Sequence, residues 1–162
     1  MRNLRKLAKE LKVKLEPIKV ALFDVDGILT NGLIHWDGKE VGYNRATHAQ
    51  DGYGMKLLMD FGIKVGVISG GNSLGVQKRF KENLNLDLVF LGNEDKREAY
   101  LKVLALGFKD EEVLYMGDEL FDIPLLKRAG FSATVPNAGH EVQESVDYIT
   151  QRQSGMACAR EG

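Results

Sequence analysis

The sequence of 162 residues contains one cysteine, Cys158, and lacks any long apolar run. A single cysteine excludes an internal disulfide framework and favours a reducing, cytoplasmic environment. No stretch approaches the roughly 20 apolar residues that a membrane-spanning helix needs, and no secretory signal pattern opens the chain. The formal net charge of -1, without a basic excess or an aromatic-basic repeat, does not indicate nucleic-acid binding. These absences indicate an ordinary globular protein whose function resides in particular residues.

The length predicts a single domain over 1–162, large enough to bury about 68–70% of its unfolded surface. Basic residues surround Leu4, Leu7 and Leu11 in the first segment, 1–14. One interpretation is a targeting or membrane-surface helix. We favour the other, an amphipathic N-terminal helix that packs its leucines on the domain and leaves its lysines in solvent.

Short apolar runs that end in polar or charged residues recur along the chain. The runs are 18–23, 63–68, 87–91 and 113–116, and the groups that follow are Asp24, Ser69, Asp95-Lys96 and Gly117-Asp118. Segments of helical periodicity separate the runs. This alternation predicts an α/β fold, a three-layer Rossmann-like parallel sheet flanked by helices. The remaining strands are expected at 131–135 and 148–150, and helices are expected to begin near Asp51, Ser73, Asp95 and Asp122.

A β-hairpin insertion is predicted at 32–44, because Asp37-Gly38 lies between two short runs that contain Trp36 and Tyr43. Only this hairpin and one helix occupy the gap between Asp24 and Ser69, so the sequence predicts no cap domain. An exposed hairpin with aromatic side chains is suited to a subunit interface. The alternative is that both aromatic rings pack on their own domain.

The polar groups at the strand ends form a set of four motifs. They are Asp24-x-Asp26-Gly27, Ser69, Lys96 and Gly117-Asp118-x-x-x-Asp122. In this order the chain resembles the haloacid dehalogenase-type phosphatases. Three stretches resemble the capless branch that hydrolyses sugar-acid phosphates, which includes the 3-deoxy-D-manno-octulosonate 8-phosphate phosphatases. They are Asp24 to Gly32, Asp51-Gly52-Tyr53-Gly54-Met55-Lys56, and the stretch from Tyr148 through the C-terminal tail, 151–162. The haloacid dehalogenase-like fold is then expected.

The resemblance implies a division of roles at the strand ends. Asp24 is expected to attack phosphorus and form an aspartyl-phosphate, and Asp26 is expected to act as general acid and then as general base. Ser69 and Lys96 would hold the phosphoryl group. The metal would be Mg²⁺, bound by Asp24, the backbone carbonyl of Asp26, and Asp118, because Mg²⁺ prefers hard oxygen ligands.

The remaining expected site residues surround these groups. Gly70, Gly71, Thr30, Asp51 and Arg160 are candidates for substrate binding, and Asp122 and Glu119 for supporting roles. The octulosonate phosphatases usually have arginine after Ser-Gly, where this chain has Gly71. They usually have a second aspartate where it has Glu119. The resemblance implies a sugar-acid phosphate as substrate. Because Gly71 and Glu119 depart from the usual pattern, both 3-deoxy-D-manno-octulosonate 8-phosphate and a related nonulosonate 9-phosphate are kept as expected substrates.

A capless site still benefits from exclusion of water. The resemblance implies a homotetramer assembled through the hairpins, in which the tails reach into adjacent sites and Arg160 contacts a neighbour's substrate. No membrane or nucleic-acid partner is expected. Two other functions are kept as alternatives: a non-catalytic oligomerisation module of sugar-acid metabolism, and a signalling domain phosphorylated on aspartate.

Overall fold

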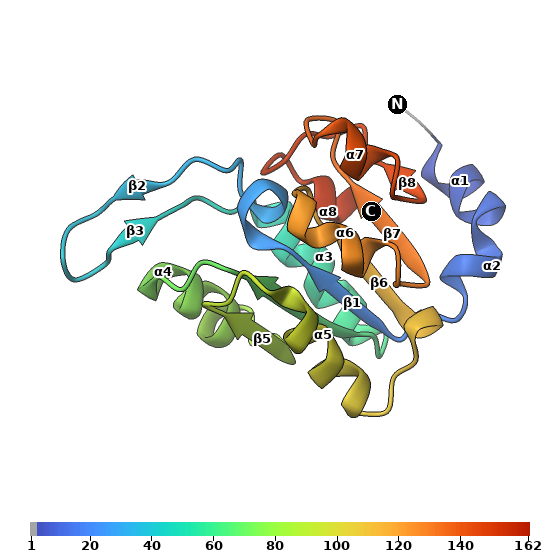
Figure 1. Ribbon diagram of the computed structural model, residues 1–162, viewed down its shortest axis with the longest axis horizontal. Helices are drawn as coiled ribbons and strands as arrows, with labels where there is room; N and C mark the ends of the chain where they lie inside the picture. Colours follow the sequence, from blue (N-terminus) through green and yellow to red (C-terminus); the bar gives the residue numbers. More distant parts are fainter. Residues whose placement is uncertain (1–2) are drawn as a thin grey trace.

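A six-stranded sheet in which all neighbouring strands run parallel forms the centre of the computed structural model, which describes residues 3–162 (Figure 1). The strand order is β5-β4-β1-β6-β7-β8. The strands are β1 (Val20–Phe23), β4 (Lys64–Ser69), β5 (Leu88–Leu91), β6 (Val113–Met116), β7 (Phe131–Thr134) and β8 (Tyr148–Ile149). The predicted parallel sheet is confirmed, and each of the expected strands lies in it.

Both faces of the sheet are buried, which explains why its strands are continuous apolar runs. In β1, Val20 and Leu22 enter one apolar cluster, and Ala21 and Phe23 enter the other. The two clusters lie on opposite faces because successive side chains of a strand alternate. Helices must therefore cover the sheet on both sides.

The helices form the outer layers. Side chains of α5 (Lys96–Ala105), α6 (Ile123–Leu126) and α7 (His140–Gln143) join the cluster of Val20 and Leu22. The opposite cluster receives side chains from α1 (Leu4–Glu10), α2 (Lys12–Leu15), α3 (Ala49–Asp60), α4 (Leu74–Gln77), the π-helical turn η2 (Lys78–Asn83) and α8 (Cys158–Glu161). Further turns are η1 (Val25–Leu29), η3 (Asp110–Glu112) and η4 (Leu120–Asp122). The result is a three-layer arrangement with the sheet in the middle.

The N-terminal segment packs on this body. Leu7, Leu11 and Leu15 are partly buried against the apolar cluster, whereas Leu4 is 44% exposed. Arg2 lies outside the described residues. None of the helices in residues 3–162 has the length and apolar character needed to span a bilayer.

Local signals start several helices where the sequence predicts them. The Ser73 side chain accepts a hydrogen bond from the Val76 N–H at the start of α4, and Asp95 accepts one from the Arg97 N–H at the start of α5. Such side-chain acceptors satisfy N–H groups that have no partner within the helix. Helix α3 instead begins after His48, whose Nδ1 accepts from the Gln50 N–H.

The predicted hairpin projects from the body of the molecule (Figure 1). Strands β2 (His35–Trp36) and β3 (Tyr43–Asn44) pair antiparallel, with Trp36 opposite Tyr43. The two rings meet edge to face, with centroids 5.2 Å apart, and both side chains are more than half exposed. The aromatic pair thus packs on itself and remains available on the surface.

Candidate active site

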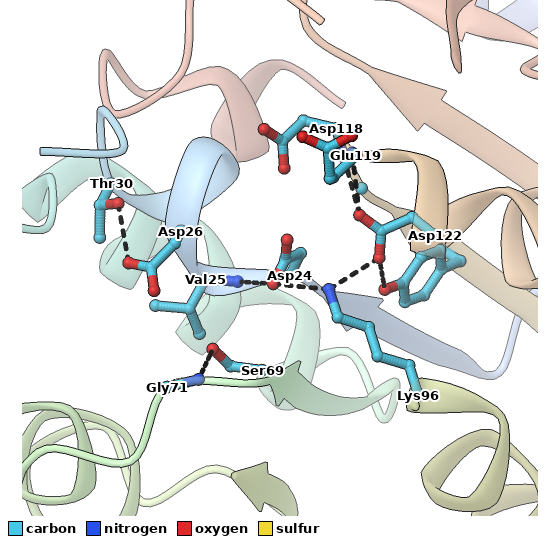
Figure 2. A network of polar contacts seen from close by, with 12 residues as sticks. Asp24, Val25, Asp26, Thr30, Ser69, Gly71, Lys96, Asp118, Glu119 and Asp122 are labelled. Atoms are coloured by element: carbon cyan, nitrogen blue, oxygen red, sulfur yellow. Dashed lines mark hydrogen bonds and ion pairs between the residues drawn. The ribbon is translucent and has the colours of Figure 1, made fainter. Parts of the chain in front are cut away.

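Three polar residues lie at the ends of adjacent strands, at one edge of the sheet. Ser69 is the last residue of β4, Asp24 directly follows β1, and Asp118 comes shortly after β6; β1 lies between the other two strands. Ligands of open parallel sheets bind at the carboxyl ends of the strands. Figure 2 shows Asp24 between Ser69 on one side and Asp118 on the other. The strand-end convergence expected from the sequence is present.

Asp24 is buried and held by two groups. Its Oδ1 accepts a hydrogen bond from the Val25 N–H at 2.6 Å and lies 2.8 Å from the Lys96 Nζ. The other carboxylate oxygen points toward Asp118 (Figure 2). Burial raises the pKa of Asp24, and the positive charge of Lys96 opposes that shift. These two contacts thus orient the carboxylate at the strand ends.

Lys96 is a buried lysine at the start of α5, only 1% exposed. Its Nζ lies 2.8 Å from Asp24 Oδ1 and 2.7 Å from Asp122 Oδ1, and the Phe121 ring covers it at 4.6 Å from the centroid. Lysine is rarely buried unless it is paired. This geometry rules out a solvated surface lysine.

Asp122 connects the parts of the site. Its Oδ1 accepts from the Tyr115 hydroxyl at 2.6 Å and from Lys96, and its Oδ2 accepts from the N–H groups of Asp118 and Glu119, both at 3.1 Å. Both oxygens are therefore engaged (Figure 2). The geometry favours the positioning role predicted for Asp122 over direct metal binding.

The carboxylates provide a suitable site for a hard divalent cation. Ligand oxygens of Asp24, Asp118 and Asp122 lie within 4.8 Å of one another, and Oδ1 of Asp118 is buried without a hydrogen-bond partner. Burial, and secondarily the charge of Asp122, raises the pKa of Asp118 to about 6. A cation would satisfy the unpartnered oxygen and offset the repulsion among the carboxylates. These residues fit Mg²⁺, which prefers oxygen ligands.

Gly27 makes room for Asp118. Its φ of 87° is in the left-handed region, and a Cβ at this position would lie 1.9 Å from Asp118 Oδ2. Glycine is thus required twice, for the turn and for the close approach. This explains in physical terms why the Asp-x-Asp-Gly pattern ends in glycine.

Asp26 lies across Asp24 from Lys96 and Asp122 (Figure 2), and its side chain is 28% exposed. Its Oδ1 accepts from the Thr30 hydroxyl at 3.3 Å and lies 2.8 Å from the Arg45 Nε. Thr30 is fully buried and also accepts from the Gly32 N–H. Thr30 therefore positions Asp26, and its predicted contact with substrate remains a prediction.

The serine loop borders the same opening. The Ser69 hydroxyl oxygen accepts from the Gly71 N–H at 3.1 Å and the side chain is buried. A Cβ at Gly70 would lie 3.1 Å from Glu94 Cγ, so the loop passes close to its neighbour. The hydroxyl hydrogen of Ser69 is left to donate to a ligand at the strand ends.

Asp51 and Arg160 form a separate contact with each other. Asp51 Oδ1 accepts from the Arg160 N–H at 2.8 Å, and the Arg160 guanidinium lies 5.5 Å from the Tyr53 ring centroid. Within this subunit the pair joins the tail to α3, and their substrate roles remain predictions. Glu119 is exposed, and its Oε1 accepts from the Leu120 N–H, so its longer arm caps η4.

Sequence reasoning missed Arg45 and Tyr115. Tyr115 lies inside an apolar strand run, where its hydroxyl gives no local signal. Arg45 follows the hairpin and belongs to none of the four motifs. Gly71 lies next to the Arg45 guanidinium, and its lack of a side chain is the signal that could have pointed to a neighbouring residue there.

Comparison with known proteins shows the family. The pattern of haloacid dehalogenase-like hydrolases matches residues 81–159. The 3-deoxy-D-manno-octulosonate 8-phosphate phosphatase of Haemophilus influenzae is 35% identical over 93% of this chain and 83% of its own length. The cobalt-bound structure of that enzyme aligns with a TM-score of 0.85 and 36% identity, covering 91% of this chain and 86% of the other.

A further structure extends the likeness to a ligand complex. The 3-deoxy-D-manno-octulosonate 8-phosphate phosphatase from Moraxella catarrhalis, in complex with magnesium ion, phosphate ion and KDO, aligns with a TM-score of 0.87. It is 33% identical, and the alignment covers 94% of this chain and 87% of the other. On this sequence identity and coverage, the chain belongs to the 3-deoxy-D-manno-octulosonate 8-phosphate phosphatase family of haloacid dehalogenase-like hydrolases.

Proposed function

We propose that this protein is a Mg²⁺-dependent phosphomonoesterase that hydrolyses 3-deoxy-D-manno-octulosonate 8-phosphate or a related nonulosonate 9-phosphate. The observation that carries the proposal is the Asp24 carboxylate, aimed toward Asp118 while Lys96 and the Val25 N–H hold its other oxygen. Carboxylates are established nucleophiles in phosphoryl transfer. Family membership supports the substrate class.

In the first step an Asp24 oxygen forms a bond to phosphorus while the bond from phosphorus to the sugar oxygen breaks. Asp26 gives its proton to the departing oxygen, and Asp24 becomes an aspartyl-phosphate. In the second step Asp26 takes a proton from water, the water oxygen attacks phosphorus, and Asp24 leaves as a free carboxylate. Use of one group as acid and then as base follows general acid–base catalysis.

Other residues hold the reacting group in place. Lys96 balances the charge of Asp24 and Asp122 and is placed to contact a phosphoryl oxygen, and Ser69 donates its hydroxyl hydrogen. Mg²⁺, held by Asp24, Asp118 and the Asp26 carbonyl, would neutralise developing charge on the phosphoryl group. Positioning and electrostatics supply most of the catalysis in phosphoryl transfer.

The experiment is a phosphate-release assay on a panel of sugar-acid phosphates, with Mg²⁺ or with chelator. We expect turnover that requires the metal, and an Asp24→Asn variant with activity reduced by on the order of 10⁴-fold or more. Asp60→Asn, an exposed carboxylate on α3, is the matched control and should retain full activity. Absence of turnover on every substrate would overturn the proposal and favour the oligomerisation module. A long-lived phosphoprotein would instead indicate signalling.

We also propose that the protein assembles as a homotetramer through its hairpins and acts in the cytoplasm. The exposed Trp36 and Tyr43 support an interface at the hairpin, because monomers rarely expose grouped aromatic side chains. Light scattering after gel filtration should show a tetramer that Trp36→Asp dissociates. Leu106→Asp, at a residue that is 64% exposed elsewhere, should not change the mass. A monomeric native protein would contradict the assembly.

A further inference from the structure

A groove lies beside the strand-end site, between the hairpin and the serine loop. Its volume is about 730 Å³. Lys39, Tyr43 and Arg45 border it on the hairpin side, and Gly71 and Ser73 border it on the loop side. Arg45 and Gly71 also lie against Asp26, so the groove opens next to the proposed general acid.

Arg45 is buried in this wall with most of its hydrogen-bonding capacity unused. Its side chain is 5% exposed, and its Nε lies 2.8 Å from Asp26 Oδ1 without the alignment that a hydrogen bond requires. Its Nη1 donates to the Ser73 hydroxyl at 3.3 Å. A guanidinium has five N–H donors, and among residues 3–162 Ser73 is its one hydrogen-bond acceptor. The guanidinium charge is paired with Asp26, and its remaining N–H donors are available to an anionic ligand in the groove that Arg45 lines.

The Arg45 guanidinium packs closely against Gly71, which has no side chain. A Cβ at Gly71 would lie 3.1 Å from Arg45 Nη1, 3.3 Å from Nη2 and 3.2 Å from Asp26 Oδ2. A side chain at position 71 and the guanidinium of Arg45 would thus compete for one place. The positive charge at this place comes from the hairpin side and not from the loop.

The Arg45 guanidinium lies on the side of the site where the leaving group is expected. Asp26 protonates the departing sugar oxygen in the proposed mechanism, so a group that contacts Asp26 from the groove meets the sugar. The phosphoryl group lies with Lys96 and Ser69 instead. An anion that reaches Arg45 is therefore carried by the sugar, and in a sugar acid that anion is the carboxylate.

We propose that Arg45 is the specificity-determining residue that binds the carboxylate of the substrate through its unused guanidinium donors. The inference rests on the proposed function and adds the residue that selects acidic over neutral sugars. Arginine matches carboxylate geometry with two parallel N–H donors. Because Arg45 is already desolvated and held in the folded protein, little ordering is needed when the ligand binds.

The test compares two substrates in the full-length protein with Mg²⁺. They are 3-deoxy-D-manno-octulosonate 8-phosphate and arabinose 5-phosphate, which lacks a carboxylate. For Arg45→Gln we expect kcat/KM on the acidic substrate to fall by about 10- to 100-fold, mainly through KM. The neutral substrate should lose less, and only in kcat through the contact of Arg45 with Asp26, so the ratio of kcat/KM between the two substrates should fall by about 10-fold or more. Arg128→Gln, an exposed arginine paired with Asp110, is the matched control and should change neither.

Equal losses on both substrates through kcat would overturn the proposal, because Arg45 would then only position Asp26. A native protein that hydrolyses no member of the sugar-acid phosphate panel would instead overturn the proposed function itself. Calorimetric titration with the phosphate-free octulosonate gives a second readout that does not depend on chemistry. Arg45→Gln should weaken that binding by about 10-fold or more, and unchanged binding would contradict the proposal.

A double variant tests whether positions 45 and 71 share one place. Gly71→Arg alone should be crowded by the native arginine and lose activity on both substrates. The double variant Gly71→Arg with Arg45→Ala should have a kcat/KM on the acidic substrate about tenfold higher than Arg45→Ala alone. If the kcat/KM of the double variant is no higher than that of Arg45→Ala, an arginine on the loop does not reach the carboxylate. That result would contradict the idea that side chains at positions 45 and 71 can occupy the same position.

Discussion

The two sides of the site differ in how firmly the structure holds them. Asp24 is 3% exposed and fixed by a backbone N–H and by Lys96, which Asp122 holds in turn. The Asp26 side chain is 28% exposed and contacts a threonine hydroxyl at 3.3 Å and an arginine from beyond the hairpin. The Asp24 side is built from residues at strand ends, whereas the Asp26 side also depends on Arg45, which follows the hairpin. The proposed nucleophile is thus held by the sheet, whereas the proposed general acid depends in part on a residue that follows the hairpin.

The largest expected effect tests whether Asp24 and Asp26 have different roles in catalysis and metal binding. Asp26→Asn should reduce turnover by about 10²- to 10⁴-fold, because it removes the proposed general acid but keeps the backbone carbonyl. Mg²⁺ should still raise the unfolding temperature of this variant. Thermal scans with Mg²⁺ or chelator measure that shift, and Asp24→Asn serves as the contrast that loses it. Loss of the shift in both variants would remove the distinction between the two sides.

The second prediction concerns Gly27, whose backbone turn leaves room for Asp118 beside Asp24. Gly27→Ala should displace Asp118 and lower turnover by about 10²-fold or more, comparable to loss of one preorganised electrostatic group. Gly62→Ala is the matched control, because Gly62 has a φ of 85° and nothing within 4 Å of the added Cβ. Both variants should lose roughly 1–2 kcal/mol to backbone strain. Only Gly27→Ala should lose its stabilisation by Mg²⁺, and an equal response in both would contradict the steric account.

The third prediction concerns pH in the metal-free protein. The folded-state pKa of Asp118 is raised from 3.8 to about 6, so its contribution to stability is fully present below pH 3.8 and is lost as pH rises through 6. Between these values the free energy of unfolding should fall by on the order of 2 kcal/mol relative to Asp118→Asn. Urea titrations in chelator from pH 4 to pH 7 measure this difference. If the difference in free energy of unfolding between the native protein and Asp118→Asn does not change with pH, the charge of Asp118 does not cause it. Near pH 7, added Mg²⁺ should restore the stability that the native protein loses on ionisation of Asp118.

The smallest expected effect concerns the support behind Lys96. Tyr115→Phe removes the hydroxyl that donates to Asp122 and should cost about 1 kcal/mol of stability and less than tenfold in turnover. Tyr100→Phe removes a comparable hydroxyl that donates to Asp110, away from the site, and should cost similar stability with unchanged turnover. If both variants keep full turnover, the Tyr115 contact is structural alone.

Much of the fold could be predicted because its signals are local. Apolar runs of four to six residues mark the buried strands, and Ser73 and Asp95 mark helix starts by the hydrogen bonds that they accept. The aspartates of the proposed active site could be located because parallel strands bring their carboxyl ends together. Arg160 illustrates the limit, since its contact with Asp51 joins residues 109 positions apart and no pattern along the chain specifies it.

The sequence by itself determined the parallel sheet, the strand ends that carry Asp24, Ser69 and Asp118, and the glycine that lets the first turn close. These follow from periodicity and backbone sterics, which act between residues that are near one another in the chain. Only the tertiary structure decided that Lys96 is buried between two carboxylates and that Arg45 occupies the space beside Gly71. Those placements depend on distances between side chains of separate elements, which arise once the sheet and the hairpin have packed.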